Sequence, residues 1–130
     1  MVYLAVGLAG IAGSLLRYYI GVLFLVSGQG VFPWATLVIN LLGCFLLGFI
    51  TTYIAKIGKL HPHLVTAIGT GFVGSFTTFS TFSVETATLL KEAHTVLALL
   101  YVFISALGGL LFSLLGYKSG EFIQRKGAEM

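Results

Sequence analysis

The sequence has 130 residues, of which 58% are hydrophobic and only 8% are charged, and its mean hydropathy is +1.04. A soluble globular domain carries about 25% charged residues, so this composition excludes that class and indicates a membrane protein. The net charge of +3 does not indicate a nucleic-acid partner, because the basic residues lie scattered at the edges of apolar runs instead of clustering with aromatic residues.

Four long apolar runs follow one another along the chain, separated by short polar connections. A bilayer-spanning helix takes about 20 residues, so the chain has room for four such helices and for no separate soluble domain. The runs are continuous, unlike the alternating strands of about ten residues in a membrane β-barrel. We therefore predict an all-α membrane protein, a single domain over residues 1–130 with spans of about 2–26, 34–55, 64–90 and 95–117.

The first run, from Val2 to about Val26, lacks the basic start and the short apolar core of a cleavable signal peptide, so we expect it to be retained. Arg17 lies about one turn from its outer end. There its guanidinium group either extends to the lipid headgroups or provides a positive charge at the mouth of a vestibule. The second run, Trp34 to Ala55, follows Pro33 and carries Asn40 in its first half.

The third run, Leu64 to about Leu90, is rich in poor helix formers. Gly69, Gly71 and Gly74 come first, and the nine residues 75–83 are all hydroxyl-bearing or phenylalanine. Glycine and threonine have low helix propensity, and hydroxyl groups compete for backbone hydrogen bonds. We therefore predict a break in this helix at residues 74–80. In a membrane a break must be packed in protein or line a cavity, and its freed carbonyls and amides are the usual material of ion sites.

The fourth run, Thr95 to about Tyr117, carries Tyr101 and Ser105 and is followed by a short polar tail. Glu85 is the only acidic residue within an apolar run. Its place one to two turns from the end of the third run favours a vestibule or a structural pair over a proton site at the midplane. Glycines in the first and last runs allow close helix approach: Gly7, Gly10, Gly13, Gly108, Gly109, Gly116 and Gly120.

Lysines and arginines in the flanks of the spans predict their orientation. With four spans, the N-terminus, the second connection and the tail share one side of the membrane. That side carries five basic residues against two on the other: Lys56, Lys59, Lys118, Arg125 and Lys126 against Arg17 and Lys91. We expect both termini in the cytoplasm and the chain in the cell membrane.

Phe76, Phe79 and Phe82 recur at every third position of the stretch 75–83. The positive edge of an aromatic ring can touch an anion, and hydroxyl groups and the Asn40 amide can donate hydrogen bonds to an anion without a buried cation that would trap it. An ion path needs such weak binding, so these residues suit a small hydrated anion. A phenylalanine stripe packed as core, with hydroxyls bonded to the backbone, is the alternative that the residues leave open.

The sequence resembles the small fluoride channels of the Fluc (CrcB) family. The similarity covers nearly the whole chain and rests on GSLLR at residues 13–17, TLVINLLG at 36–43 and GFVGSFTTFSTFSVE at 71–85. The resemblance implies a fluoride-selective channel, and no enzyme, that lowers cytoplasmic fluoride by passive export. It also implies a dual-topology architecture, in which two four-helix subunits assemble antiparallel with two fluoride paths.

The same resemblance implies roles for individual residues. The fluoride pathway would use Asn40, Phe79, Phe82, Tyr101 and Ser105, with Thr78, Ser80 and Thr81 as weaker candidates. Carbonyl oxygens of Gly74 and Thr77 would hold a structural sodium ion at the dimer interface, and Arg17 and Glu85 would lie at vestibules. Gly109 departs from the family pattern, because a hydroxyl residue there would extend the polar track beyond Ser105.

Two alternatives stay open on the sequence alone. The difference in basic residues between the two sides is larger than expected for a chain that inserts in both orientations. The partner is therefore either a second copy of the chain or a homologous subunit of opposite orientation. A small multidrug-type, proton-coupled exporter also has four helices in antiparallel dimers. Such an exporter needs a carboxylate in its first span, where this chain has Arg17 and no acid.

Overall fold

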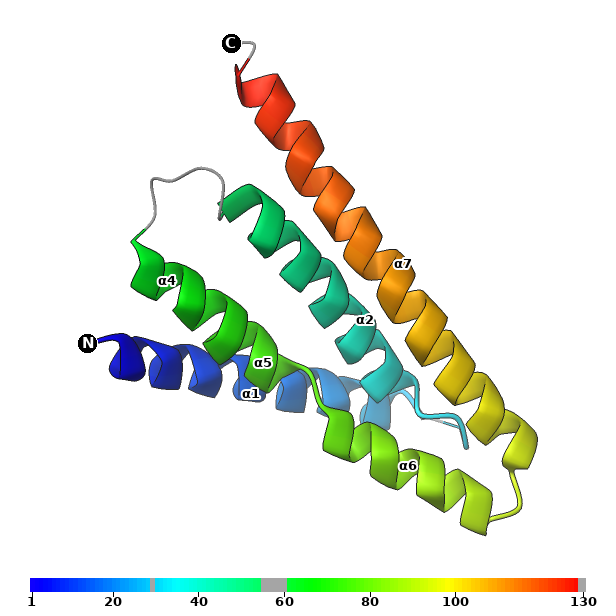
Figure 1. Ribbon diagram of the computed structural model, residues 1–130. Coiled ribbons are helices and arrows are strands. Elements are labelled where there is room, and N and C mark those ends of the chain that lie inside the picture. Colours follow the sequence, from blue (N-terminus) through cyan, green and yellow to red (C-terminus); the bar gives the residue numbers. More distant parts are fainter. Residues whose placement is uncertain (29, 55–60, 129–130) are drawn as a thin grey trace.

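The computed structural model describes residues 1–28, 30–54 and 61–128, and the regular elements of that part of the chain are all helical (Figure 1). In chain order they are α1 (Val2–Val26), α2 (Trp34–Phe49), the π-helical η1 (Ile50–Ile54), α4 (Pro62–Thr66), the π-helical η2 (Ala67–Val73), α5 (Gly74–Phe76), α6 (Phe79–Lys91) and α7 (Thr95–Ala128). Ala55, Lys56 and Lys59, which entered the predicted span and orientation, lie outside the described residues.

The helices pack as two pairs. α2 packs mainly on α7, and α1 packs on the continuous rod formed by α4, η2 and α5. Figure 1 shows the N-terminus, the start of α4 and the C-terminal end of α7 at one end of the bundle, with the α1–α2 connection and the α6–α7 turn at the other. This is the up-and-down order that four spans require, and the predicted all-α, four-helix architecture is confirmed.

Glycines bring the helices of each pair into backbone contact. A Cβ atom added at Gly48 would collide with the Ser113 carbonyl oxygen, and one at Gly116 would collide with that of Phe45. In the other pair, a Cβ atom at Gly13 would collide with the carbonyl oxygen of Phe72. Close packing by Gly13 and Gly116 is therefore confirmed. At Gly7 an added Cβ atom would meet no described atom within 4 Å.

The outer faces of the bundle are apolar. On α1, four residues at helical spacing each expose 57–65% of their surface: Leu4, Leu8, Ile11 and Leu15. Such a continuous apolar face is out of place in water and suits contact with lipid chains. Residues Val2–Val26, Trp34–Tyr53 and Thr95–Lys126 form three helices that are each long and apolar enough to cross a membrane. The protein is therefore a multi-pass membrane protein.

The third helix is broken, as predicted, but over fewer residues than 74–80. Only Thr77 and Thr78 leave the helix, with extended backbone at ψ 158° and 119°. Residues 74–76 still belong to α5, and Phe79 and Ser80 already open α6. The break is short because side chains on both sides of it replace the missing backbone bonds, as described below.

Two features of the helices have no counterpart in the predictions. The polar tail after Tyr117 continues α7 as helix as far as Ala128. The Gln124 Nε2 atom on this extension donates hydrogen bonds to the carbonyl oxygens of Thr52 (2.7 Å) and Tyr53 (3.2 Å) in η1. A π-helical turn pairs its carbonyls irregularly, and Gln124 satisfies two of them, so the tail is held as helix by its contact with η1.

The α6–α7 turn contains Ala93 in the left-handed region, with φ 63°. The His94 N–H donates to the Leu89 carbonyl (2.8 Å) and the Ala93 N–H to that of Leu90 (3.2 Å), which is the Schellman arrangement that glycine usually closes. We expect Ala93→Gly to raise the free energy of unfolding by about 0.5–1 kcal/mol. Ala87→Gly, on the exposed side of α6, should lower it by about 1 kcal/mol.

Unfolding of the two variants in detergent, followed by circular dichroism, measures both changes. If both substitutions lowered the free energy of unfolding by a similar amount, the left-handed backbone conformation assigned to Ala93 would not be unfavourable for alanine.

Candidate functional site

Asn40 on α2 holds the broken segment of the third helix through two hydrogen bonds. Its Nδ2 atom donates to the Thr78 carbonyl oxygen at 3.0 Å, and its Oδ1 atom accepts from the Thr78 N–H at 2.9 Å. The side-chain amide thus replaces the backbone partners that Thr78 loses where the helix stops. One hydrogen of Nδ2 is left over and can serve another acceptor.

Thr78 begins α6 as its N-cap residue. Its Oγ1 atom accepts from the Thr81 N–H at 3.2 Å, donates to Thr81 Oγ1 at 3.0 Å and lies 3.3 Å from Ser80 Oγ. A threonine cap satisfies one of the free N–H groups at a helix start. The weaker pathway candidates Thr78, Ser80 and Thr81 therefore form one hydroxyl cluster at the start of α6.

Carbonyl groups at the break lose their helical donors, among them those of Gly74 and Thr77. In a continuous helix the Thr78 N–H would bond to Gly74, and the Thr81 N–H would bond to Thr77. Here the Thr78 N–H bonds to Asn40 and the Thr81 N–H bonds to the Thr78 side chain. Within residues 1–28, 30–54 and 61–128, no other hydrogen bond reaches either carbonyl oxygen. The two residues expected to hold sodium thus carry freed carbonyls, and so do Ser75 and Phe76, whose helical donors would be the N–H groups of Phe79 and Ser80.

Gly43 makes room for the broken segment on the α2 side. A Cβ atom added at Gly43 would collide with the Thr77 Cγ2 atom, and the Thr77 Oγ1 atom donates to the Val73 carbonyl oxygen at 3.0 Å. The Thr77 side chain is therefore seated between α2 and η2. Asn40 and Gly43 together fix the path of the chain through the break.

A groove of about 530 Å³ lies beside the break, between α2, α5, α6 and α7; we call it the break groove. It brings together five pathway candidates and both carbonyl residues: Asn40, Thr78, Phe79, Phe82, Ser105, Gly74 and Thr77. None of the described residues that line it is charged. The Ser105 hydroxyl forms no hydrogen bond with the described part of the chain, so it is free to bond to an ion or ligand in the groove. The groove therefore offers uncharged donors only.

Phe79 and Phe82 form the aromatic part of the break groove. Their ring centroids lie 5.8 Å apart at an interplanar angle of 36°, and Phe82 packs on Tyr101 at 4.9 Å. Phe79 exposes 79% of its surface, so it is not a packed core residue. Ser83 Oγ does donate to the Phe79 carbonyl oxygen at 2.9 Å, and Phe76 is buried with an exposed fraction of 2%. The packing alternative is therefore confirmed for the Ser83 hydroxyl and for Phe76, but not for the Phe79 ring.

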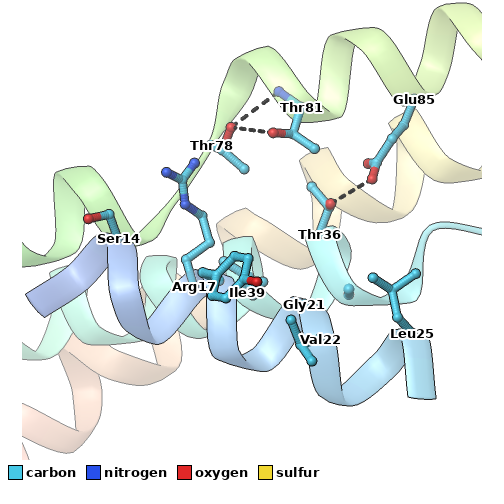
Figure 2. Close-up of a pocket in the computed structure, with 12 residues that line it drawn as sticks. Ser14, Arg17, Gly21, Val22, Leu25, Thr36, Ile39, Thr78, Thr81 and Glu85 are labelled. Atoms are coloured by element: carbon cyan, nitrogen blue, oxygen red, sulfur yellow. Dashed lines mark hydrogen bonds between the residues drawn. The ribbon is translucent and has the colours of Figure 1, made fainter. Parts of the chain in front are cut away.

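A second pocket of about 390 Å³ lies on the α1 side of the break; we call it the α1 pocket. Arg17 and Glu85, both expected at vestibules, line it together with Thr36, Thr78 and Thr81 (Figure 2). Figure 2 shows the Arg17 side chain pointing towards Thr78, while Glu85 reaches Thr36 from α6. Thr78 lines both the α1 pocket and the break groove, so the break separates the two.

Glu85 is held by two hydroxyl donors. Thr36 Oγ1 donates to its Oε1 atom and the Tyr101 hydroxyl donates to its Oε2 atom, each at 2.8 Å. Tyr101 has an exposed fraction of 0%, and its ring lies edge-on to Phe32 at 5.5 Å. The Tyr101 hydroxyl thus contributes to the carboxylate of the α1 pocket, and Tyr101 is not among the described residues that line the break groove with Ser105.

Thr36 and Gly43 are site residues that received no role from the sequence. Their spacing of four and three residues from Asn40 places all three on one face of α2, and this spacing could have found them. Ser80 is exposed and lines neither the break groove nor the α1 pocket. The structure therefore brings most of the predicted residues to the break but divides them between its two sides.

Residues 4–117 match the family model described as CrcB-like protein, Camphor Resistance (CrcB). The chain is 52% identical over 126 residues to the fluoride-specific ion channel FluC 1 of Bacillus cereus, covering 97% of this chain and 88% of the relative. It is 57% identical over 113 residues to FluC 1 of Desulfitobacterium hafniense, covering 87% and 97%. FluC 2 of Listeria innocua is 44% identical over 128 residues, covering 98% and 97%.

Proposed function

The chain belongs to the CrcB-like family, and on that premise we propose that it is a fluoride-specific ion channel that exports fluoride passively from the cytoplasm. The observation that carries the proposal is the 52–57% identity, over most of the chain, to relatives named as fluoride-specific ion channels. It is not an enzyme. An inside-negative membrane potential assists the exit of an anion by about 2.3 kcal/mol per charge per 100 mV.

The break groove supports the same function on chemical grounds. Its lining offers a free hydroxyl on Ser105, one unused N–H of Asn40 and the ring edges of Phe79 and Phe82. These groups can bind a small anion without a cation that would hold it permanently. We assign fluoride contacts to these four residues and place Tyr101, Thr78, Ser80 and Thr81 beside the path.

The small multidrug-type exporter is not supported. Its coupled proton needs a carboxylate in the first span, and the charged residue of α1 is Arg17. Glu85 belongs to α6 and is engaged by Thr36 and Tyr101. The family and the relatives favour the channel.

A growth assay tests the proposed function in cells. Bacteria that lack their own fluoride exporter should grow at fluoride concentrations that stop the parent strain once they express this chain. Expression confirmed in the membrane without any gain in fluoride tolerance would count against the proposal. A variant truncated after residue 76, which lacks α6 and α7, is the negative control.

We place the working channel in an antiparallel dimer. Phe79 exposes 79% of its surface, and the polar residues Asn40 and Ser105 line a groove that is open on this chain. Polar groups are costly against lipid, so a second subunit is needed to cover them. Relatives named both FluC 1 and FluC 2 match the chain, so a homologous subunit of opposite orientation is the alternative to a second copy.

We also assign a structural sodium ion to the carbonyl oxygens of Gly74 and Thr77 at the dimer interface. The fit rests on the two diverted donors: the Thr78 and Thr81 N–H groups bond to side chains and leave these oxygens free. A hard cation prefers oxygen ligands, and two subunits would supply four carbonyls. When bound, the ion would be coordinated by these oxygens and would link the broken helices of the two subunits.

Sodium is expected to stabilise the assembled protein. The thermal unfolding midpoint in detergent should be higher in sodium chloride than in choline chloride, since a ligand at 100 times its dissociation constant adds about 2.7 kcal/mol to stability. Potassium chloride at equal concentration is the control for ionic strength. Identical midpoints in all three salts would rule out the assigned sodium.

The orientation follows from the flanking charges. Both termini lie in the cytoplasm in the favoured insertion, because five of the seven basic residues belong to that side. The accessibility of labels at the two termini, measured from each side of the cell membrane, distinguishes a second copy of the chain from a homologous partner subunit. Labelling from both sides fits a dual-topology homodimer, and labelling from one side fits a homologous subunit.

A further inference from the structure

The C-terminal extension of α7 presents a stripe of basic and aromatic side chains that the fluoride path does not use. Lys118, Phe122, Arg125 and Lys126 are all exposed, and Phe122 exposes 66% of its surface. Phe122 lies four residues after Lys118, and Arg125 and Lys126 lie three and four residues after Phe122, which places all four on one side of the helix. The Lys126 Nζ atom lies 5.8 Å from the centre of the Phe122 ring. We call this set the basic stripe.

The opposite face of the extension is anchored to η1. Gln124 donates to the carbonyl oxygens of Thr52 and Tyr53, and a Cβ atom added at Gly120 would lie 3.0 Å from Thr52 Cβ. The extension is therefore held against the bundle as a fixed element, with the basic stripe turned away from η1. Because the helix is fixed, the three cations are presented together without a further cost for ordering the backbone.

The length of α7 places the stripe at the membrane surface. Its 34 residues make a helix of about 51 Å, whereas the hydrocarbon core is about 30 Å thick and the whole bilayer about 40–45 Å. The apolar part ends near Tyr117, so Lys118 begins the segment that enters the headgroup layer. An exposed phenylalanine between cations suits this layer, where its ring meets lipid and its neighbours meet phosphate.

We propose that the basic stripe binds the phosphate of an anionic phospholipid headgroup. Three cations stand on residues 118–126 against one acid, Glu121, whose Oε1 atom accepts from the Tyr117 hydroxyl at 3.3 Å. Basic residues beside a membrane attract anionic lipid, and Arg125 can bind a phosphate in bidentate fashion. The site is independent of the fluoride path, because it shares no residue with the break groove or the α1 pocket.

Native mass spectrometry of the purified protein tests the proposal. The probes are phosphatidylglycerol, phosphatidylcholine with the same chains, and inorganic phosphate. We expect the protein to retain phosphatidylglycerol in preference to phosphatidylcholine. The triple variant Lys118→Gln/Arg125→Gln/Lys126→Gln should lower the apparent affinity for phosphatidylglycerol by at least about tenfold. Lys91→Gln, at the C-terminal end of α6 and on the other side of the membrane, is the matched control and should bind as the wild type does.

Three results would overturn the lipid site. They are equal retention of both lipids by the wild type, unchanged phosphatidylglycerol affinity in the triple variant, and full displacement of the lipid by inorganic phosphate, which would indicate a site for free anions. Should the triple variant fail to fold, the single variants Arg125→Gln and Lys126→Gln replace it, and each should weaken phosphatidylglycerol binding severalfold.

Discussion

Replacing Phe79 or Phe82 by isoleucine is expected to lower fluoride flux by at least about 100-fold while the assembled protein persists. Isoleucine keeps the apolar bulk but has no positive ring edge to meet the anion. Phe79 is exposed at the break groove and Phe82 lies 5.8 Å from it, so both rings border the same passage. A 100-fold loss corresponds to about 2.7 kcal/mol of added barrier, which requires that the rings contact the ion where it has shed water.

Fluoride efflux from proteoliposomes, measured with a fluoride electrode, gives the flux of each variant, and size-exclusion chromatography gives its assembly. Phe103→Ile is the matched control, because Phe103 is exposed on α7 and lines neither the break groove nor the α1 pocket. Phe103→Ile should conduct as the wild type does. Unchanged flux in both Phe79→Ile and Phe82→Ile would mean that the two rings contribute only to packing and do not contact fluoride.

Asn40→Ala is expected to abolish conduction and also to destabilise the protein. The substitution removes two hydrogen bonds and leaves the N–H and the carbonyl of Thr78 without partners at the break. An unsatisfied buried group costs about 1–3 kcal/mol, so the loss of stability from the two groups should be about 2–6 kcal/mol. Without these two hydrogen bonds, the carbonyls of Gly74 and Thr77 also lose their fixed positions, and the sodium-dependent rise in the unfolding midpoint should shrink or vanish.

Ser105→Ala separates this structural role from a role in binding fluoride. The Ser105 hydroxyl lines the break groove without a partner in the described ranges, so its removal should lower flux and leave the unfolding midpoint and its response to sodium unchanged. Asn40→Ala with a wild-type midpoint and a wild-type sodium response would show that Asn40 contacts the ion but does not clamp the break. Unfolding of both variants in sodium chloride and in choline chloride measures these outcomes.

The sequence was sufficient for the architecture because the signals are local. Four apolar runs predict four helices, and the hydroxyl and glycine content of residues 69–83 predicts where the third helix breaks. The side chain of Asn40 also stood out, since it is an amide inside an apolar run and can donate hydrogen bonds there. These features depend on composition over one or two helical turns, and the structure bears them out.

The pairings across the bundle depended on tertiary geometry that no spacing gives. Asn40 and Thr78 are 38 residues apart, and Thr36 and Glu85 are 49 apart. Tyr101 shares a helix face with Ser105 in the sequence, yet its hydroxyl is drawn to the Glu85 carboxylate. The helical continuation of α7 likewise depends on Gln124 meeting free carbonyls of η1. Polar groups in a membrane bond to whichever partners the packing supplies.

The most direct test of the channel is fluoride efflux from proteoliposomes that contain the wild-type protein and a potassium gradient, with valinomycin to carry the compensating charge. We predict fluoride efflux that rises with the amount of protein, no comparable chloride efflux, and no need for a proton gradient. Absence of fluoride efflux from protein that is folded and assembled would contradict the account.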